Sequence, residues 1–275
     1  MSTTPRRGSH ILAVFPDLHV PFQDPACLSI IKKFVARYKP ERIAILGDWA
    51  DATTATSHQF CNLENRRDAS VRDVLRDEYK PVNKILDHLQ KHTKQTIYLE
   101  GNHEFRIQSI AARSQSEFIR SVYSLVSPHN NLIANRKDII WVPYSPTVGL
   151  SKIELIPESE QCSALWAVHG WSASNRASDT HLKKVNYRVS VVHGHVHRAT
   201  RTQPIVEPLG QRTIKAWSSG CLSELRPFYQ HGRPNNWVHG FDVIYCKNDS
   251  SAWTVFHVEI KNGRAILPGG EEIRA

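Results

Sequence analysis

Five short clusters of histidine, aspartate and asparagine are spread along this 275-residue chain. They are Asp17-Leu18-His19, Gly47-Asp48-Trp49-Ala50-Asp51, Gly101-Asn102-His103-Glu104, His169-Gly170 and Gly194-His195-Val196-His197. Carboxylate and amide oxygens combined with imidazole nitrogens suit divalent transition metals. Two such ions held about 3.5–4 Å apart also need a carboxylate that bridges them. The clusters contain enough of these ligands for two metal ions.

Each cluster follows an apolar, β-prone run that predicts a buried strand. The runs are Ile11–Phe15, Ile43–Leu46, Ile97–Leu99, Ala164–Val168 and Val189–Val192. Ligands at the ends of buried strands gather at the edge of a sheet even when they are far apart in sequence. We therefore expect the five clusters to form one site.

The spacing within the clusters supports this expectation. Asp17 and His19, like His195 and His197, are two residues apart, so in an extended segment both side chains of a pair point to one face. In three clusters a glycine directly precedes the first ligand, where it allows a positive φ or a close backbone approach in a tight strand-to-loop turn. They are Gly47, Gly101 and Gly194.

Composition restricts the class of protein. With 275 residues, of which 40% are hydrophobic and 22% charged, the chain can form one large domain. No apolar stretch approaches the ~18 residues of a membrane span, and the apolar run Ile11–Phe15 is too short for the core of a signal peptide. We expect a cytoplasmic protein without membrane contact. The five cysteines form no C-x-x-C pair, which predicts reduced thiols.

The chain is basic, with a net charge of +9 and a pI of about 9.4. Such a charge attracts polyanions, including nucleic acid. The excess is spread along the chain, however, and the adjacent basic pairs are short and scattered: Arg6-Arg7, Lys32-Lys33, Arg66-Arg67, Arg136-Lys137 and Lys183-Lys184. Charge therefore favours a nucleic-acid partner without deciding for one.

Apolar periodicity predicts alternating strands and helices, and then mostly strands. Helices are expected over Pro25–Tyr38, with Asp24 as N-cap, and over residues 71–92, where Pro81 should kink or split the helix. A further helix should follow Glu104, run through Phe118 and end before Pro128. Later strands are expected at Ile139–Val142, Lys152–Ile156, Leu165–Val168, Val189–Val192, Thr213–Trp217, Phe241–Tyr245 and Trp253–Ile260.

This pattern predicts a single α/β domain over residues 11–265. Residues 1–10 should form a flexible N-terminus and residues 266–275 a C-terminal tail. The polar, aperiodic stretch at about 50–70 should form a small cap insertion over the site. A βαβαβ first half followed by a β-rich second half fits two stacked β-sheets flanked by helices.

In this order, the motifs Asp-x-His, Gly-Asp-x-x-Asp, Gly-Asn-His-Glu, His-Gly and Gly-His-x-His resemble those of the calcineurin-like metallophosphoesterases. The resemblance covers residues 11–200 by motif, and is closest to stand-alone phage or bacterial members. It implies a four-layer sandwich with two mixed β-sheets. It also implies a phosphoester substrate and two divalent ions, with manganese first and iron, zinc, cobalt or nickel as alternatives.

The resemblance assigns a role to each motif residue. A hydroxide that bridges the two metals would attack phosphorus in line, and His103, which binds no metal, would stabilise the transition state and protonate the leaving group. The implied ligands are Asp17, His19, Asp48 and His197 for one metal, and Asp48, Asn102, His169 and His195 for the other, with Asp48 bridging.

Four neighbouring residues are candidates for substrate binding or for supporting the ligands. Glu104 or Asp51 would orient a histidine. Arg106, one turn into the helix that follows, would either grip phosphate or lie on a solvated helix face. His193 would share a face with His195, and we expect it to be structural or supporting.

The sequence favours a phosphodiesterase acting on nucleic acid or nucleotides, such as a nuclease for DNA or RNA. A phosphomonoesterase, including a Ser/Thr protein phosphatase, remains open. That branch is expected to carry further arginines after its Asp block, where this chain has Trp49-Ala50. A non-catalytic scaffold is disfavoured because no implied ligand and no catalytic histidine is missing. The sequence indicates no oligomeric state.

Overall fold

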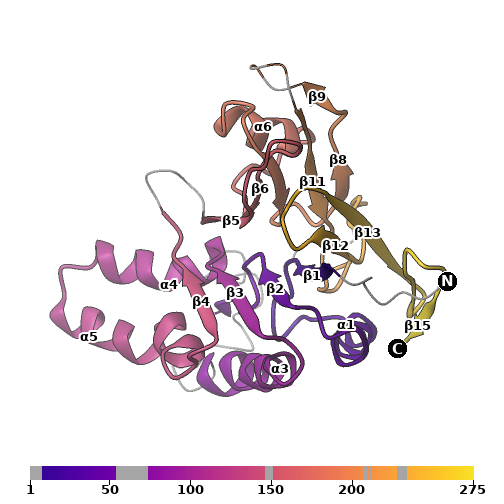
Figure 1. The fold of residues 1–275 in the computed structure, drawn as a ribbon. Helices are drawn as coiled ribbons and strands as arrows, with labels where there is room; N and C mark the ends of the chain where they lie inside the picture. Colours follow the sequence, from indigo (N-terminus) through magenta and orange to yellow (C-terminus); the bar gives the residue numbers. More distant parts are fainter. Residues whose placement is uncertain are drawn as a thin grey trace.

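The computed structural model describes residues 8–53, 74–145, 151–206, 208, 210, 212–227 and 234–275. Within these ranges the chain forms two mixed β-sheets that stack on each other, with helices on both outer sides (Figure 1). The first seven residues of the expected flexible N-terminus lie outside the described residues. So does the expected cap insertion from residue 54 onward, and its role stays a prediction.

The larger sheet has the strand order β15-β14-β13-β12-β1-β2-β3-β4. Strands β1 to β4 are parallel, and β12 pairs with β1 in the antiparallel direction. The bounds are β1 (Ser9–Phe15), β2 (Arg42–Ile45), β3 (Gln95–Leu99), β4 (Ile139–Val142), β12 (Gly240–Lys247), β13 (Trp253–Lys261), β14 (Arg264–Ile266) and β15 (Glu272–Arg274). The sheet thus extends into the last ten residues, which the sequence set apart as a tail.

The smaller sheet has the order β5-β6-β7-β11-β8. Its three central strands are parallel, and β5 and β8 are antiparallel to their neighbours. The bounds are β5 (Lys152–Ile156), β6 (Leu165–Val168), β7 (Ser190–His193), β8 (Ala199–Arg201) and β11 (Ala216–Ser219). A separate two-stranded ribbon pairs β9 (Ile205–Val206) with β10 (Thr213–Ile214).

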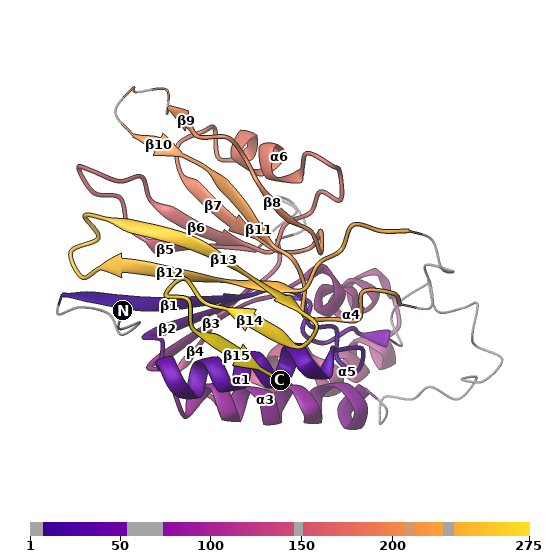
Figure 2. The ribbon, with the colours of Figure 1, turned by 90° about the vertical axis from the view of Figure 1, so that its right-hand side faces the viewer.

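Helices cover the two outer faces of this pair of sheets. Figure 2 shows α1 and α3 beneath the larger sheet and α6 beyond the smaller one. The bounds are α1 (Pro25–Tyr38), η3 (Val74–Tyr79, a π-helix), α3 (Lys80–Gln90), α4 (Asn102–Arg113), α5 (Glu117–Val126), η4 (His129–Ile133, a π-helix) and α6 (Ala177–Lys184). None of the helices in the described part of the chain is both long and apolar enough to span a membrane.

Strand β1 is buried on both faces, which shows why the fold has four layers. Ile11, Ala13 and Phe15 belong to the core shared with α1 and α3, whereas Leu12 and Val14 belong to the core between the two sheets. A strand buried on both faces is a continuous apolar run without polar alternation. On the far side, Leu182 of α6 packs against the smaller sheet. The fold is therefore the predicted α/β four-layer sandwich.

Two helices differ from the sequence-based expectations. The single helix expected after Glu104 is two helices, because the backbone is extended at Ser114 (ψ 133°) and α5 begins only after Ser116. Helix α6 was not predicted, since its eight residues contain too few apolar side chains to show a period. The expected break at Pro81 is present, as η3 ends and α3 begins one residue before it.

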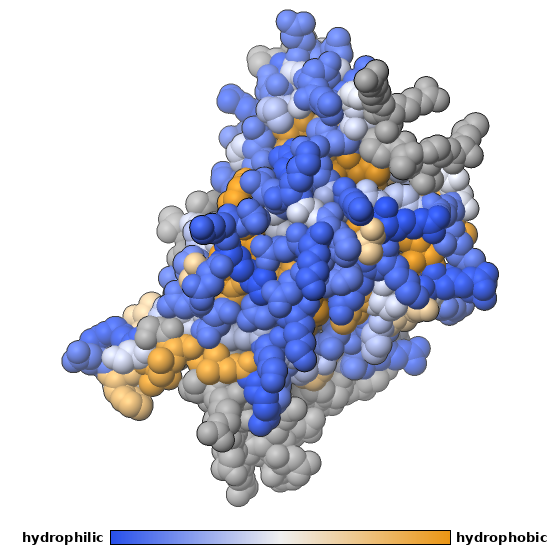
Figure 3. Space-filling model, turned by 60° about the horizontal axis from the view of Figure 1, so that its bottom comes forward, coloured by the Kyte–Doolittle hydropathy of each residue, from blue (hydrophilic) through white to orange (hydrophobic). Residues whose placement is uncertain are grey.

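Helices α4 and α5 form a hairpin at one side of the molecule (Figure 1). Hydrophilic side chains cover most of the face drawn in Figure 3, but the projection on its left carries apolar surface. Ile110, Phe118 and Leu125 of the hairpin are exposed.

Candidate metal centre

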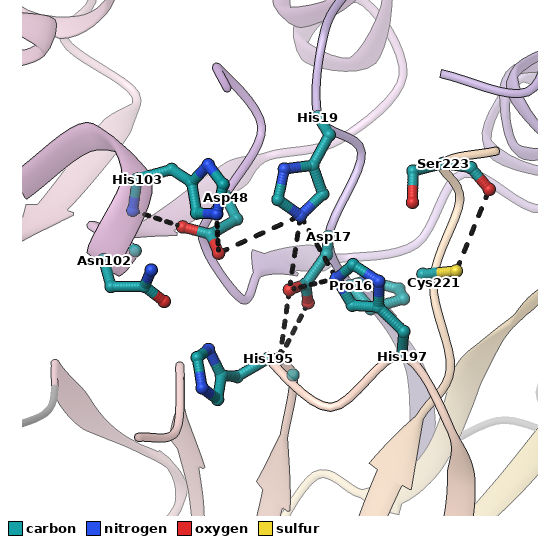
Figure 4. A network of polar contacts seen from close by, with 12 residues as sticks. Pro16, Asp17, His19, Asp48, Asn102, His103, His195, His197, Cys221 and Ser223 are labelled. Carbon is teal, nitrogen blue, oxygen red and sulfur yellow. Dashed lines mark hydrogen bonds and ion pairs between the residues drawn. The ribbon is translucent and has the colours of Figure 1, made fainter. Parts of the chain in front are cut away.

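The five motif clusters meet at one edge of the stacked sheets. Strands β1, β2 and β3 of the larger sheet and β6 and β7 of the smaller sheet each lead directly into one cluster. Figure 4 shows side chains from these loops converging on one place. The prediction that strand ends gather the clusters is confirmed.

The chain reaches the site through tight turns. His19, Asp48, His195 and His197 have left-handed backbones, with φ of 51°, 53°, 71° and 57°. This conformation is uncommon for residues with a Cβ atom, and strained residues of this kind concentrate at functional sites. The expectation of extended segments around these residues is therefore wrong: turns aim the paired side chains.

The glycines before the clusters allow very close backbone packing. A Cβ atom on Gly101 would lie 2.1 Å from Oδ1 of Asp48, and one on Gly194 would lie 2.5 Å from Oδ1 of Asp17. Gly47 has a φ of 96° and would place a Cβ 2.8 Å from Nδ1 of His169. No side chain fits at these positions without displacing a candidate ligand.

Asp17, His19 and His197 form a first group of donor atoms. His197 Nε2 lies 3.2 Å from Oδ2 of Asp17 and 3.1 Å from Nε2 of His19. All three residues are buried. They follow strands of two different sheets, so the group forms only when the sheets stack.

Asp48, His169 and His195 form a second group, next to Asn102. His169 Nε2 lies 3.3 Å from Oδ2 of Asp48 and 2.9 Å from Oδ1 of Asn102. Oδ2 of Asp48 is also 4.0 Å from Nε2 of His19, in the first group. Asp48 thus reaches both groups, as a bridging carboxylate must.

Hydrogen bonds behind two histidines direct lone pairs into the site. Nδ1 of His19 lies 2.7 Å from Oδ1 of Asp51, and Nδ1 of His169 donates to the carbonyl of Leu46 at 2.6 Å. In a neutral imidazole with Nδ1 protonated, Nε2 carries a lone pair. At His169 that nitrogen faces the oxygens of Asp48 and Asn102, an arrangement that is repulsive unless a cation lies between them. The donor set therefore fits divalent metal ions.

Without a bound ion, protons take these positions. Burial opposes protonation of His19, but its hydrogen bond to Asp51 and the nearby carboxylates raise its pKa to about 9. Burial is likewise outweighed at His169, where Asp48 raises the pKa to about 9. Burial lowers the pKa of His195 to about 4. Metal binding must therefore displace protons from His19 and His169 at neutral pH.

His103 comes within reach of His19 and Asp48, with which it forms a further group of donor atoms, and it is held from behind by Asp51. Its Nδ1 is 2.9 Å from the Asp51 carbonyl and 3.0 Å from Asp51 Oδ1, two acceptors that favour a proton on this nitrogen. Its Nε2 faces the site, 3.9 Å from Oδ2 of Asp48. Nη1 of Arg106 lies 3.0 Å from His103 Nδ1, which places a cation next to the site. Asp51 thus contacts both His19 and His103, the orienting role expected of Asp51 or Glu104.

Glu104 does not orient a histidine. Its carboxylate accepts the backbone N–H groups of Asp48, Trp49, Ala50 and Gly101, at 2.7 to 3.1 Å, and the hydroxyl of Tyr98 at 2.9 Å. Burial raises the pKa of Glu104 and the charge of Asp48 adds to the rise, against these donors. Glu104 therefore holds the backbone of the loop that carries Asp48.

A family model described as calcineurin-like phosphoesterase matches residues 11–199 of the chain. The chain belongs to the calcineurin-like phosphoesterase family. Three solved structures of similar fold are Vps29 of Cryptosporidium parvum, Vps29 of Chaetomium thermophilum and a novel phosphatase of Mycoplasma pneumoniae. Their sequence identities are 10%, 11% and 11%, and their TM-scores 0.50, 0.46 and 0.41.

These likenesses extend over almost the whole of each chain. They cover 97%, 97% and 91% of this chain, and 99%, 95% and 94% of the Cryptosporidium, Chaetomium and Mycoplasma chains. At such low identity they concern the fold alone. The chain matches no curated protein sequence.

His193 was a candidate for supporting the ligands. It is fully buried. Its Nε2 is 2.8 Å from Ser178 Oγ and its Nδ1 is 3.0 Å from the Gly194 carbonyl. Both ring nitrogens are engaged, which agrees with the structural role expected for it.

Two residues near the calcineurin-like site were not among the site residues expected from the sequence. Glu78 accepts the backbone N–H groups of Ala52 and Thr53 at 2.7 and 2.9 Å, and so fixes the chain directly after Asp51. The Trp237 ring packs edge-on against His197, with ring centroids 4.1 Å apart. Neither residue lies near a motif in sequence, so no local signal could have identified it.

Proposed function

We propose that this protein is a dinuclear metal-dependent phosphodiesterase. The observation that carries the proposal is the position of Asp48, which lies between two buried groups of histidine and aspartate whose lone pairs converge. Such convergence is costly in a buried site unless cations are bound. The ligands are Asp17, His19, Asp48 and His197 for one ion and Asp48, Asn102, His169 and His195 for the other.

The ions, when bound, activate a water molecule near neutral pH and neutralise charge on the phosphoryl oxygens. The protein contributes orientation and a proton. The hydrogen bond to Asp51 fixes His103 with Nε2 toward the reacting group, where an imidazolium can donate to the leaving oxygen. Arg106, beside His103, supplies a positive charge for a second phosphate or a non-bridging oxygen.

The proposed substrate class is a phosphodiester of nucleic acid or nucleotides, with manganese as the working metal. Three features support it: the net charge of +9, the position of Arg106, and the half-buried Trp237 beside His197, which offers an aromatic face near the site. Aromatic rings of this kind stack on nucleobases irrespective of sequence.

A substrate panel with Mn²⁺ tests the proposal. It compares a bis-aryl phosphodiester, an aryl phosphomonoester, single- and double-stranded DNA, RNA and cyclic nucleotides. We expect diester cleavage that chelation abolishes and that Asp48→Asn lacks. Efficient cleavage of the monoester, with all diesters and nucleic acids left intact, would replace this proposal with a phosphomonoesterase.

A further inference from the structure

A second set of metal-type donors lies beside the first turn of α1. Atoms of Asp24, Cys27 and His239 come within 4.8 Å of one another. Cys27 is fully buried, whereas Asp24 and His239 are partly exposed, so an ion can enter from solvent. None of the three belongs to the proposed dinuclear centre.

Each donor is held in a way that suits coordination. Asp24 caps α1, with its Oδ1 accepting the Cys27 N–H at 2.8 Å, and this bond holds the carboxylate within reach of the Cys27 sulfur. Nε2 of His239 donates to the Ser223 carbonyl at 2.8 Å, which leaves the lone pair on Nδ1. A backbone carbonyl behind one ring nitrogen is the usual support of a metal-binding histidine.

In the described part of the chain, two unpartnered polar atoms belong to residues next to these donors: Gln23 precedes Asp24, and the Ser223 carbonyl accepts from His239. Ser223 and Gln23 pair through an isolated β-bridge. The Ser223 hydroxyl is buried, its residue only 3% exposed, and it has no hydrogen-bond partner among the described residues. The same holds for Oε1 of Gln23. Buried polar groups are normally satisfied, and ordered water on a bound ion would satisfy these.

We propose that Asp24, Cys27 and His239 bind a single zinc-class divalent ion at a third metal site. Thiolate, imidazole and carboxylate are all zinc ligands, and water completes the four-coordinate shell. Binding breaks the S–H bond of Cys27 and releases its proton to solvent while the sulfur–metal bond forms. No redox change accompanies this step.

The backbone explains what such an ion would do. Asp24 N–H donates to the Leu222 carbonyl at 2.9 Å, and Leu222 N–H donates to the Asp17 carbonyl at 2.7 Å. Val238 N–H, next to His239, donates to the His197 carbonyl at 2.9 Å. The third ion therefore ties the start of α1 to the loops behind Asp17 and His197, and stabilises the edge that holds the dinuclear centre.

Cobalt substitution tests the site, because thiolate bound to Co²⁺ gives a near-ultraviolet charge-transfer band. The proposed dinuclear centre has only nitrogen and oxygen ligands, so the band does not arise from it, and the cysteine variants below assign it to one thiol. Protein stripped by chelator and titrated with Co²⁺ should show the band saturating at about one cobalt per chain. Cys27→Ser should abolish it, and the matched control Cys162→Ser should keep it.

Two further variants complete the test. His239→Gln, at a partly exposed position that leaves the core intact, should weaken cobalt binding in this band at least about tenfold. Asp48→Asn should lower total cobalt without changing the band, so failure of the dinuclear proposal and failure of this one are distinguishable. A wild-type protein without the band at saturating Co²⁺, or a band unchanged in Cys27→Ser or His239→Gln, overturns the third site.

Discussion

The backbone N–H of Asp48 donates to the Glu104 carboxylate at 2.9 Å, although 56 residues separate them. Glu104 lies in the first turn of α4, which also carries Asn102 and His103. One buried carboxylate thus fixes the strained loop of Asp48 relative to the helix that supplies a ligand and the proposed acid. The spacing of both proposed metal sites depends on this contact.

Glu104→Gln should therefore impair both stability and metal binding. An amide has one acceptor oxygen, and its NH₂ group would face backbone donors that now bond to carboxylate. Buried donors without acceptors cost about 1–3 kcal/mol each. We expect a loss of about 2–4 kcal/mol in the free energy of unfolding, measured by urea titration, and a lower metal content by elemental analysis. Glu117→Gln at an exposed position of α5 should change neither.

His103→Ala separates chemistry from metal binding. If His103 donates a proton, the variant should keep its metal content and lose roughly 10²–10⁴-fold in kcat. The loss should be smaller for an aryl diester whose nitrophenolate leaving group needs no proton. A variant that loses metal instead would show that His103 is a ligand, and would contradict the role proposed here.

Replacing Asp48 and replacing Asn102 should affect different numbers of metal sites. Because Asp48 reaches both groups of donors, Asp48→Asn should weaken both sites, whereas Asn102→Ala should empty mainly the site of His169 and His195. Elemental analysis of the loaded, active wild type should give about two ions per chain, and about three when the proposed third site is also filled. Full activity with no more than one bound ion in total is incompatible with a bridging Asp48.

The elements that deliver the site were predictable from the sequence, because each motif follows an apolar run of strand length. What the sequence could not show is how the motifs turn. His195 and His197 are spaced as on an extended strand, yet both are left-handed, and in this turn the backbone N–H of His195 donates to the Asp17 carboxylate. A two-residue spacing has the same appearance in a strand and in a turn.

Contacts between segments far apart in the chain could not be predicted from the sequence either. Glu104 was read as a partner for histidine because acidic residues beside motif histidines often serve that purpose. Its real partners are backbone amides of a loop more than 50 residues away, which have no side-chain signature. Glu78 fixes Thr53 in the same way. Residues that support a loop through its backbone leave no pattern of residue types.

The stability of chelator-treated protein should fall as pH rises from about 6.5 to 9. His19 and His169 have pKa values raised to about 9 by neighbouring carboxylates, against 6.5 unfolded. In this window the folded state keeps protons on these two imidazoles that the unfolded state has lost, so their contribution to stability declines as pH rises and is fully present only below 6.5. His195, with its pKa lowered to about 4 by burial, is neutral throughout in the folded protein and opposes this trend only near pH 6.5, where its unfolded form still binds protons.

Metal should reverse this trend, since deprotonated imidazoles bind it more tightly at higher pH. The gap in Tm between metal-loaded and chelator-treated protein should therefore widen from pH 6.5 to pH 9. A gap that stays constant would mean that the ions do not compete with these protons.

Salt dependence distinguishes a polymeric from a small substrate. An enzyme that follows a nucleic-acid backbone makes several phosphate contacts, and each releases condensed counterions. Its affinity for single strands should fall with a log–log slope of about −0.7 per contact. We expect KM for DNA or RNA to rise steeply between low and moderate salt, and KM for a bis-aryl diester to change little. Arg106→Gln should reduce the slope for nucleic acid by about one contact if Arg106 binds a phosphate. Equal salt slopes for the polymer and the small diester would show that the enzyme contacts only the scissile phosphate, and nucleotides would then replace nucleic acid as the proposed substrate.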